Sequence, residues 1–180
     1  MSHFMKLSLG RKATLCLLAW GLYADFAIAK CERTPIHPDA SYFVAPQSDG
    51  GEVVDSATSF VWQRCLAGKT WNRVSQQCTG TALNMTWQAS VDFVKALPKA
   101  KGNPWRLPSH YELMTLVDLA CSEPALNTKW FGDPDGTFLW AGSSYALLPD
   151  YAWGLKYARG ELTYEIKSNE FQLRLIRSPN

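Results

Sequence analysis

The segment most informative about local structure is Trp105-Arg106-Leu107-Pro108-Ser109-His110-Tyr111-Glu112-Leu113. Pro108 favours an extended residue before it and cannot continue a helix backwards. Ser109 can cap a new helix, and Glu112 can reach back to the Ser109 amide, which together form a capping box. The segment therefore predicts that an extended stretch ends and a helix begins at Ser109. We expect this helix to continue to about Ala120.

Further elements can be predicted on both sides of this segment. Thr86 is a plausible cap for an earlier helix, because apolar residues follow it at helical spacing until Pro98. Short runs rich in β-branched and aromatic residues predict a hairpin upstream and several strands downstream. A hairpin, two helices and an antiparallel sheet amount to an α+β domain. The predicted strands are 53–55, 60–62, 138–144, 151–157, 162–166 and 171–177.

The N-terminus has the pattern of a secretory signal peptide. Lys6, Arg11 and Lys12 precede an apolar run that ends in Ala27-Ile28-Ala29. The run is shorter than the roughly 20 residues that a membrane-spanning helix needs, so we expect no transmembrane segment after cleavage. The expected organisation is a signal peptide (1–29), an N-terminal arm (30–51) and one domain (52–178). The protein would then be periplasmic, secreted or exposed at the cell surface.

The charge balance changes once the signal peptide is removed. The whole chain has 18 Lys+Arg and 16 Asp+Glu. The signal peptide contains three of the basic residues and one acidic residue, which leaves fifteen of each sign. A neutral exported domain gives no reason to expect nucleic acid as a partner.

Four cysteines remain after the signal peptide: Cys31, Cys65, Cys78 and Cys121. An even number in an exported chain predicts disulfides. Three pairings are possible, and we favour Cys65–Cys78, which closes a short loop, and Cys31–Cys121, which ties the arm to the end of the second helix. Zinc binding by four thiolates is the alternative, but the paired C-x-x-C spacing of structural zinc sites is missing.

No pattern of catalytic residues stands out. The sequence has no Gly-x-Ser-x-Gly elbow, no His-Glu-x-x-His and no phosphate-binding glycine loop. Glu112 and Asp118 could act as an acid/base pair, but the capping box already explains Glu112. We therefore expect a protein that is not an enzyme and has no cofactor. Asp133 and Asp135 could bind calcium, but the loop lacks the six or more oxygens required, and a turn is the better interpretation.

Sugar binding requires exposed aromatic rings with polar groups around them. Four aromatic residues lie in or beside the long predicted loops, and packing under those loops is the alternative for each. Three lysines form a basic cluster that could bind sulfate groups, although a solvated helix end explains them as well. The aromatic candidates are Trp130, Phe131, Tyr145 and Tyr151, and the basic candidates are Lys95, Lys99 and Lys101.

Several motifs resemble the DUF1566 family, also called the Lcl C-terminal domain family after a collagen-like bacterial adhesin. The resemblance extends from about residue 50 to residue 177. It departs at Ser59, where the family usually has Gly, and no collagen-like repeat precedes the domain. The matching motifs are Trp62-Gln63-Arg64-Cys65, Thr86-Trp87-Gln88-Ala89, Trp105-Arg106-Leu107-Pro108, Tyr151-Ala152-Trp153 and Arg174-Leu175-Ile176-Arg177.

The resemblance implies an exported bacterial protein with a C-type-lectin-like fold. In that fold two helices flank a small, twisted antiparallel sheet, here stabilised by disulfides. For the adhesin, the resemblance implies carbohydrate binding and adhesion through sulfated glycosaminoglycans. We therefore expect a non-catalytic recognition module that binds a glycan. The alternative is a structural or assembly subunit that docks another envelope or filament protein.

Overall fold

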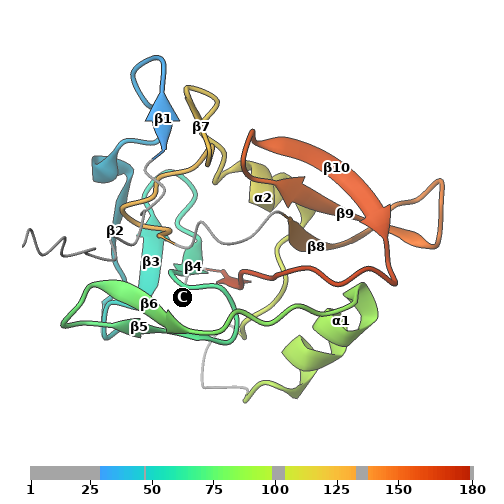
Figure 1. Cartoon of the computed structure of the whole chain (residues 1–180). Coiled ribbons are helices and arrows are strands. Elements are labelled where there is room, and N and C mark those ends of the chain that lie inside the picture. Colours follow the sequence, from blue (N-terminus) through green and yellow to red (C-terminus); the bar gives the residue numbers. More distant parts are fainter. Residues whose placement is uncertain (1–28, 47, 99–103, 133–137, 179–180) are drawn as a thin grey trace, which may run out of the picture.

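The computed structural model describes residues 29–46, 48–98, 104–132 and 138–178 (Figure 1). These residues are mostly β: they form eleven strands in four small sheets, together with two short α-helices and one 3-10 turn. The expected α+β, C-type-lectin-like fold, with two helices flanking one sheet, is therefore wrong. The expected signal peptide (1–29) lies, except for Ala29, outside the described residues.

The elements follow one another through the sequence as a series of short strands. The strands are β1 (Lys30–Cys31), β2 (Tyr42–Val44), β3 (Glu52–Asp55), β4 (Val61–Gln63), β5 (Lys69–Asn72), β6 (Gln77–Gly80), β7 (Cys121–Ser122), β8 (Leu139–Ser144), β9 (Tyr151–Lys156), β10 (Glu161–Ile166) and β11 (Ile176–Arg177). The helical elements are η1 (Asp39–Ser41), α1 (Trp87–Ala96) and α2 (His110–Met114).

All strands pair antiparallel within their sheets. The largest sheet has the order β11-β4-β3-β2, and a three-stranded sheet has the order β10-β9-β8. The predicted hairpin is present as β3 and β4. Part of the arm is not irregular, because β2 pairs with β3 and buries Tyr42, which is 3% exposed. The remaining sheets are the pairs β1-β7 and β5-β6.

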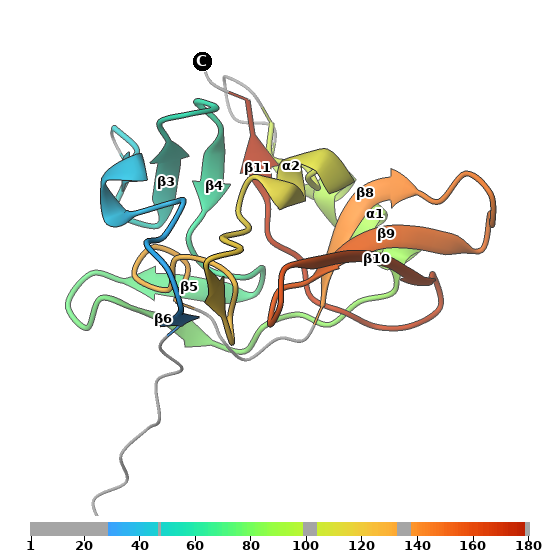
Figure 2. The same ribbon diagram turned by 90° about the horizontal axis from the view of Figure 1, so that it is seen from above.

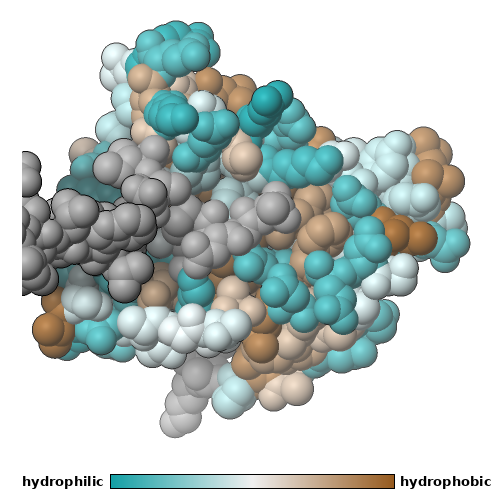
Figure 3. Space-filling view, viewed as in Figure 1, coloured by the Kyte–Doolittle hydropathy of each residue, from teal (hydrophilic) through white to brown (hydrophobic). Residues whose placement is uncertain are grey.

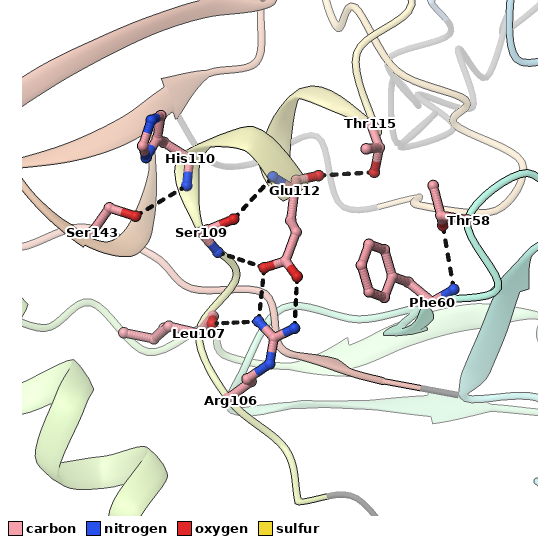
Figure 4. Close-up of polar contacts among 9 residues, drawn as sticks. All are labelled: Thr58, Phe60, Arg106, Leu107, Ser109, His110, Glu112, Thr115 and Ser143. Atoms are coloured by element: carbon pink, nitrogen blue, oxygen red, sulfur yellow. Dashed lines mark hydrogen bonds and ion pairs between the residues drawn. The ribbon is translucent and has the colours of Figure 1, made fainter. Parts of the chain in front are cut away.

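The turn between β3 and β4 is organised by the buried carboxylate of Asp55. One oxygen of Asp55 accepts a hydrogen bond from the Ala57 amide at 2.9 Å, and the other accepts one from the Thr58 hydroxyl at 2.7 Å. The Thr58 hydroxyl in turn accepts a hydrogen bond from the Phe60 amide (Figure 4). Ser59 has a φ of 61°, in the left-handed region that glycine enters at no steric cost. This explains physically why glycine suits the position of Ser59.

Helix α1 starts where the sequence predicts. The Thr86 hydroxyl accepts a hydrogen bond from the Ala89 amide at 3.3 Å, which caps the first turn. The half-buried side chains of Val91 and Val94 pack against a small core that includes Leu173. The capping pattern and the helical spacing therefore both describe this helix correctly.

Helix α2 has the predicted start but not the predicted length. Both hydrogen bonds of the capping box between Ser109 and Glu112 are present. The helix ends at Met114 rather than near Ala120. The amides of Leu116 and Val117 donate to carbonyls three residues back, and the amide of Asp118 then donates to the distant carbonyl of Ala125. The chain therefore leaves the helical path although its apolar spacing predicts a longer helix.

Two disulfides connect the chain, Cys31 to Cys121 and Cys65 to Cys78. These are the pairs that we favoured from the sequence. The first disulfide joins β1 to β7, and the second joins the segment that follows β4 to β6. Among the described residues, no helix has the length and apolar character required to cross a membrane.

The main core lies where the four-stranded sheet, α2 and the three-stranded sheet meet. It includes the fully buried side chains of Trp62, Leu113, Leu139, Leu155 and Ile176. The three-stranded sheet and the β5-β6 hairpin lie at opposite ends of the molecule in both views (Figures 1 and 2). The two ends therefore present separate surfaces.

Candidate functional site

The structure separates the four aromatic candidates. Phe131 is 1% exposed and its ring meets that of Tyr42 edge-on at 5.2 Å, so it packs the core rather than facing a ligand. Trp130 is half-buried, and its indole N–H donates to the carbonyl of Asp39 at 3.0 Å. The guanidinium of Arg64 lies 4.9 Å from the Trp130 ring. These contacts give Trp130 a packing role between η1 and Arg64, which follows β4.

The lysine cluster is described only in part. Lys95 is exposed in the last turn of α1, and its ammonium lies 3.6 Å from Asp92. Lys99 and Lys101 lie outside the described residues, so the sulfate-binding cluster stays a prediction. Asp133 and Asp135 also lie outside the described residues, so calcium binding at this loop also stays a prediction. Within the part of the chain that is described, no three His, Cys, Asp or Glu side chains are grouped to hold a metal.

The other two aromatic candidates, Tyr145 and Tyr151, belong to a larger surface cluster. The Tyr145 ring stacks on that of Tyr164 at 4.2 Å with an interplanar angle of 8°. Trp153 meets Tyr145 edge-on at 5.1 Å, and Tyr151 meets Tyr164 edge-on at 5.8 Å. We call this cluster the aromatic face; its members are His110, Tyr111, Tyr145, Tyr151, Trp153 and Tyr164.

Strand geometry brings the aromatic face together. Tyr151 and Trp153 are two residues apart on β9, so their side chains point to the same side of the sheet. Tyr164 lies directly opposite Trp153 in the β9-β10 register. In an antiparallel pair such directly opposed residues have neighbouring side chains. The two strands therefore hold these three rings on one surface.

Helix α2 completes the aromatic face at one end. The His110 amide donates to the Ser143 hydroxyl of β8 at 3.3 Å, which places the start of α2 against the sheet (Figure 4). The His110 ring stacks on Trp153 at 5.1 Å and lies 4.0 Å from the ring of Tyr111. Tyr111 is 75% exposed and Tyr164 is 39% exposed. The aromatic face therefore offers ring surface to solvent at both ends.

The turn between β8 and β9 adds apolar side chains next to the aromatic face. Leu147 is 78% exposed and Leu148 is 44% exposed. Apolar residues gather at this end of the molecule in the space-filling view (Figure 3). Contiguous apolar surface of this kind on a folded domain is often a binding surface.

A partly buried ion pair supports the start of α2. Arg106 donates to both carboxylate oxygens of Glu112, at 2.7 and 2.6 Å, while the Ser109 amide donates to the same carboxylate (Figure 4). Burial by itself would raise the pKa of Glu112, but the hydrogen bonds from Arg106 and Ser109 lower it below its ordinary value. The pKa of Arg106 is raised by its hydrogen bond to Glu112.

Asp118 also has a structural role. Its side chain is 1% exposed, although the helical spacing predicts that it points away from the buried stripe. Its carboxylate accepts hydrogen bonds from the amides of His37 at 2.8 Å and Ala120 at 3.0 Å. Burial opposes ionisation of Asp118, but the amides of His37, Ile36 and Ala120 lower its pKa overall. The carboxylates of Glu112 and Asp118 therefore hold two turns of the chain in place.

Sequence reasoning found only part of the aromatic face. It selected Tyr145 and Tyr151 because they flank a predicted loop, but it did not select Trp153, Tyr164 or Tyr111. The alternation of Tyr151 and Trp153 along one strand was the available signal for a shared face. No sequence pattern indicates that α2 adds the rings of His110 and Tyr111, because their position depends on how the helix packs against β8.

Comparison with known proteins identifies one family. The model of the Lcl C-terminal domain family matches residues 51–177. No curated protein and no solved structure matches the chain. The two disulfides are consistent with a protein outside the cytoplasm.

Proposed function

We propose, since the chain belongs to the Lcl C-terminal domain family, that it is an exported, non-catalytic recognition domain whose aromatic face binds a glycan. The observation that carries this proposal is the stack of Tyr145 on Tyr164, with Trp153 and His110 continuing the row of rings. Tyrosine and tryptophan combine an apolar ring with a polar tip, so they suit ligands that have apolar C–H faces and polar edges. Sugar rings have this character.

The shape of the aromatic face suits an extended ligand rather than a small enclosed one. Its rings follow one another at centroid separations of 4.0 to 5.8 Å across α2, the turn after β8, β9 and β10. Each ring contact supplies about 0.5–1.5 kcal/mol, so three or four contacts give a dissociation constant of about 1 mM. Repeated units of a polysaccharide, or several copies of the domain on one surface, would increase that affinity.

A glycan array probed with the mature protein tests this function. We expect binding to at least one glycan class and a drop of about tenfold in affinity for Tyr164→Ala, which removes one stacked ring. Phe43→Ala is the matched control, since Phe43 is 47% exposed on β2, away from the aromatic face. Array binding that survives unchanged in Tyr164→Ala and Tyr111→Ala would contradict the proposal.

Assembly with an envelope or filament protein is the second candidate function. The exposed Leu147 and Leu148 beside the aromatic face favour it, because protein interfaces combine aliphatic and aromatic side chains in this way. An empty glycan array would support assembly if an envelope protein co-purified with the wild type but not with Leu147→Ser. Co-purification that Leu147→Ser leaves intact would speak against this use of the surface.

A further inference from the structure

A cleft lies at the end of the molecule opposite the aromatic face. It opens between the β5-β6 hairpin, the β3-β4 pair and the end of α1, and it has a volume of about 280 Å³. Figures 1 and 2 show the β5-β6 hairpin and the β3-β4 pair away from the β8-β9-β10 sheet. We call it the hairpin cleft; the lining residues that matter here are Asp49, Glu52, Gln63, Thr70, Trp71 and Trp105.

Trp71 is one wall of the hairpin cleft and is held firmly in place. The guanidinium of Arg64 lies 3.6 Å from the centre of the Trp71 ring. Gly50 approaches the indole so closely that an added Cβ would lie 2.8 Å from its nitrogen. Glycine is therefore required for the turn before β3 to pack against this ring.

Trp105 is a second wall and comes from a distant part of the sequence. Its neighbour Arg106 exchanges two backbone hydrogen bonds with Ile176 of β11, at 2.9 and 3.0 Å. The guanidinium of Arg177 lies 5.5 Å from the Trp105 ring and is 2.9 Å from the carboxylate of Glu52. The pairing of Arg177 with Glu52 thus positions this ring and neutralises one of the two acidic side chains in the cleft.

Uncommitted polar groups lie beside the two rings. The Asp49 carboxylate accepts a hydrogen bond from the Gly51 amide through one oxygen only. Within the described residues, the side chains of Gln63 and Thr70 have no hydrogen-bond partner, although both residues line the cleft. A carboxylate, an amide and a hydroxyl in the lining of a cleft with aromatic walls are suited to the hydroxyl groups of a sugar.

The charge and size of the cleft restrict its ligand further. The lining carries both signs, with Asp49 and Glu52 opposed by Lys69 and by Arg177 beside it. Such a lining offers no excess charge to a phosphate, sulfate or ammonium group. Ligand pockets usually measure about 300–1,000 Å³, so this cleft admits a ligand of one ring rather than an oligosaccharide.

The geometry points to a second binding site, in which the hairpin cleft holds one uncharged pyranose ring against Trp71 and Trp105. Asp49 and Gln63 hydrogen-bond its hydroxyl groups. The disulfide from Cys65, itself in the cleft lining, to Cys78 of β6 fixes the hairpin beside β4 before the ligand arrives. This site requires none of the residues of the aromatic face.

The test follows the indole N–H signals of Trp71 and Trp105 by NMR, assigned by Trp→Phe substitution. The probes are the methyl pyranosides of glucose, galactose and mannose, and N-acetylglucosamine, with glucuronate as the charged comparison. We expect at least one uncharged probe to shift both signals and to saturate in the millimolar range, and glucuronate to bind more weakly. Gln63→Ala should weaken binding about fivefold, the effect of one lost hydrogen bond.

Two further variants separate this site from the aromatic face. Tyr164→Ala should leave pyranoside binding to the cleft unchanged, even where it abolishes glycan-array binding. Trp105→Phe keeps an apolar ring, so it should fold and weaken the pyranoside about as much as Gln63→Ala. The inference is overturned if no uncharged probe shifts the two signals at about 50 mM, far above a millimolar dissociation constant. It is also overturned if binding persists unchanged in both cleft variants.

Discussion

The aromatic face and the hairpin cleft lie in regions of the molecule that are stabilised by different forces. Strands β8 and β9 bury Leu139, Ala141, Ala152 and Leu155 completely, so hydrophobic burial holds the sheet under the aromatic face. Neither β5 nor β6 contains a buried residue. The hairpin is instead held by a disulfide and by the Arg64 guanidinium on Trp71. One region depends on core packing, and the other depends on a covalent bond.

Loss of a core ring should have the largest effect, and it should act through the sheet region. Trp140 on β8 is fully buried, meets Phe171 edge-on at 5.1 Å and donates its indole N–H to the carbonyl of Met85 at 2.9 Å. We expect Trp140→Ala to reduce the free energy of unfolding by about 3–5 kcal/mol in urea titrations. Leu147→Ala, on the exposed turn of the same sheet, should change it by less than about 0.5 kcal/mol. Similar losses in the two variants would show that burial does not stabilise this region.

Removal of the hairpin disulfide should have a smaller and more local effect. The bond joins residues 13 apart, so Cys65→Ser/Cys78→Ser should cost about 3 kcal/mol through the loop entropy of the unfolded chain. Hydrogen exchange should accelerate at the amides of β5 and β6 while those of β8 and β9 remain protected. Uniform acceleration across all four strands would instead mean that the two regions unfold as one unit.

The ion pair between Arg106 and Glu112 lies between the two regions, and its removal should have the smallest effect. Glu112→Gln keeps the size of the side chain but removes its charge, and we expect a loss of about 1–2 kcal/mol at neutral pH. The pKa of Glu112 is lowered in the folded protein, so its charge stabilises the fold fully above the unfolded pKa of about 4.3. This stabilisation disappears as the pH falls through the folded pKa.

Urea titrations of the wild type and Glu112→Gln between pH 7 and pH 3 measure this dependence. The difference in the free energy of unfolding should be constant near neutral pH and should shrink below about pH 4.3. Thr86→Ala is the control, because it removes the capping hydroxyl of the other helix and no charge, and should cost about 1 kcal/mol across the range. A Glu112→Gln effect that stays constant to pH 3 would exclude a contribution from the charge.

Local signals in the sequence predicted several elements well. Thr86 and Ser109 begin the two helices because their hydroxyl groups satisfy backbone amides within three residues along the chain. The strand runs at 138–144, 151–157 and 162–166 correspond to β8, β9 and β10. For the candidate site, Tyr145 and Tyr151 were selected by their position beside a loop, and they lie on the aromatic face.

Features that depend on distant contacts were missed. Strand β2 consists of three β-prone residues, too short a run to predict a strand by itself, and it pairs with β3. The β5-β6 hairpin, expected only as a disulfide-closed loop, is likewise too short for periodicity to indicate. Phe131 and Trp130 looked like loop aromatics, yet the ring of Tyr42, from the arm, packs against both. The expectation of two helices flanking one small sheet was wrong because the strands divide among four sheets, which depend on pairing between distant segments.

The amino-acid sequence alone determined the family, the two helix starts, the β3-β4 hairpin and the favoured cysteine pairs. Most of these follow from residues near one another in the chain or from a family motif, and Cys31–Cys121, 90 residues apart, is the pair left over once Cys65 joins Cys78. The tertiary structure decided the length of α2, the course of the arm, the set of rings on the aromatic face and the existence of the hairpin cleft. Hydrogen bonding and burial between distant segments set these features. For example, the amide of Asp118 donates to the carbonyl of Ala125 rather than to a helical partner.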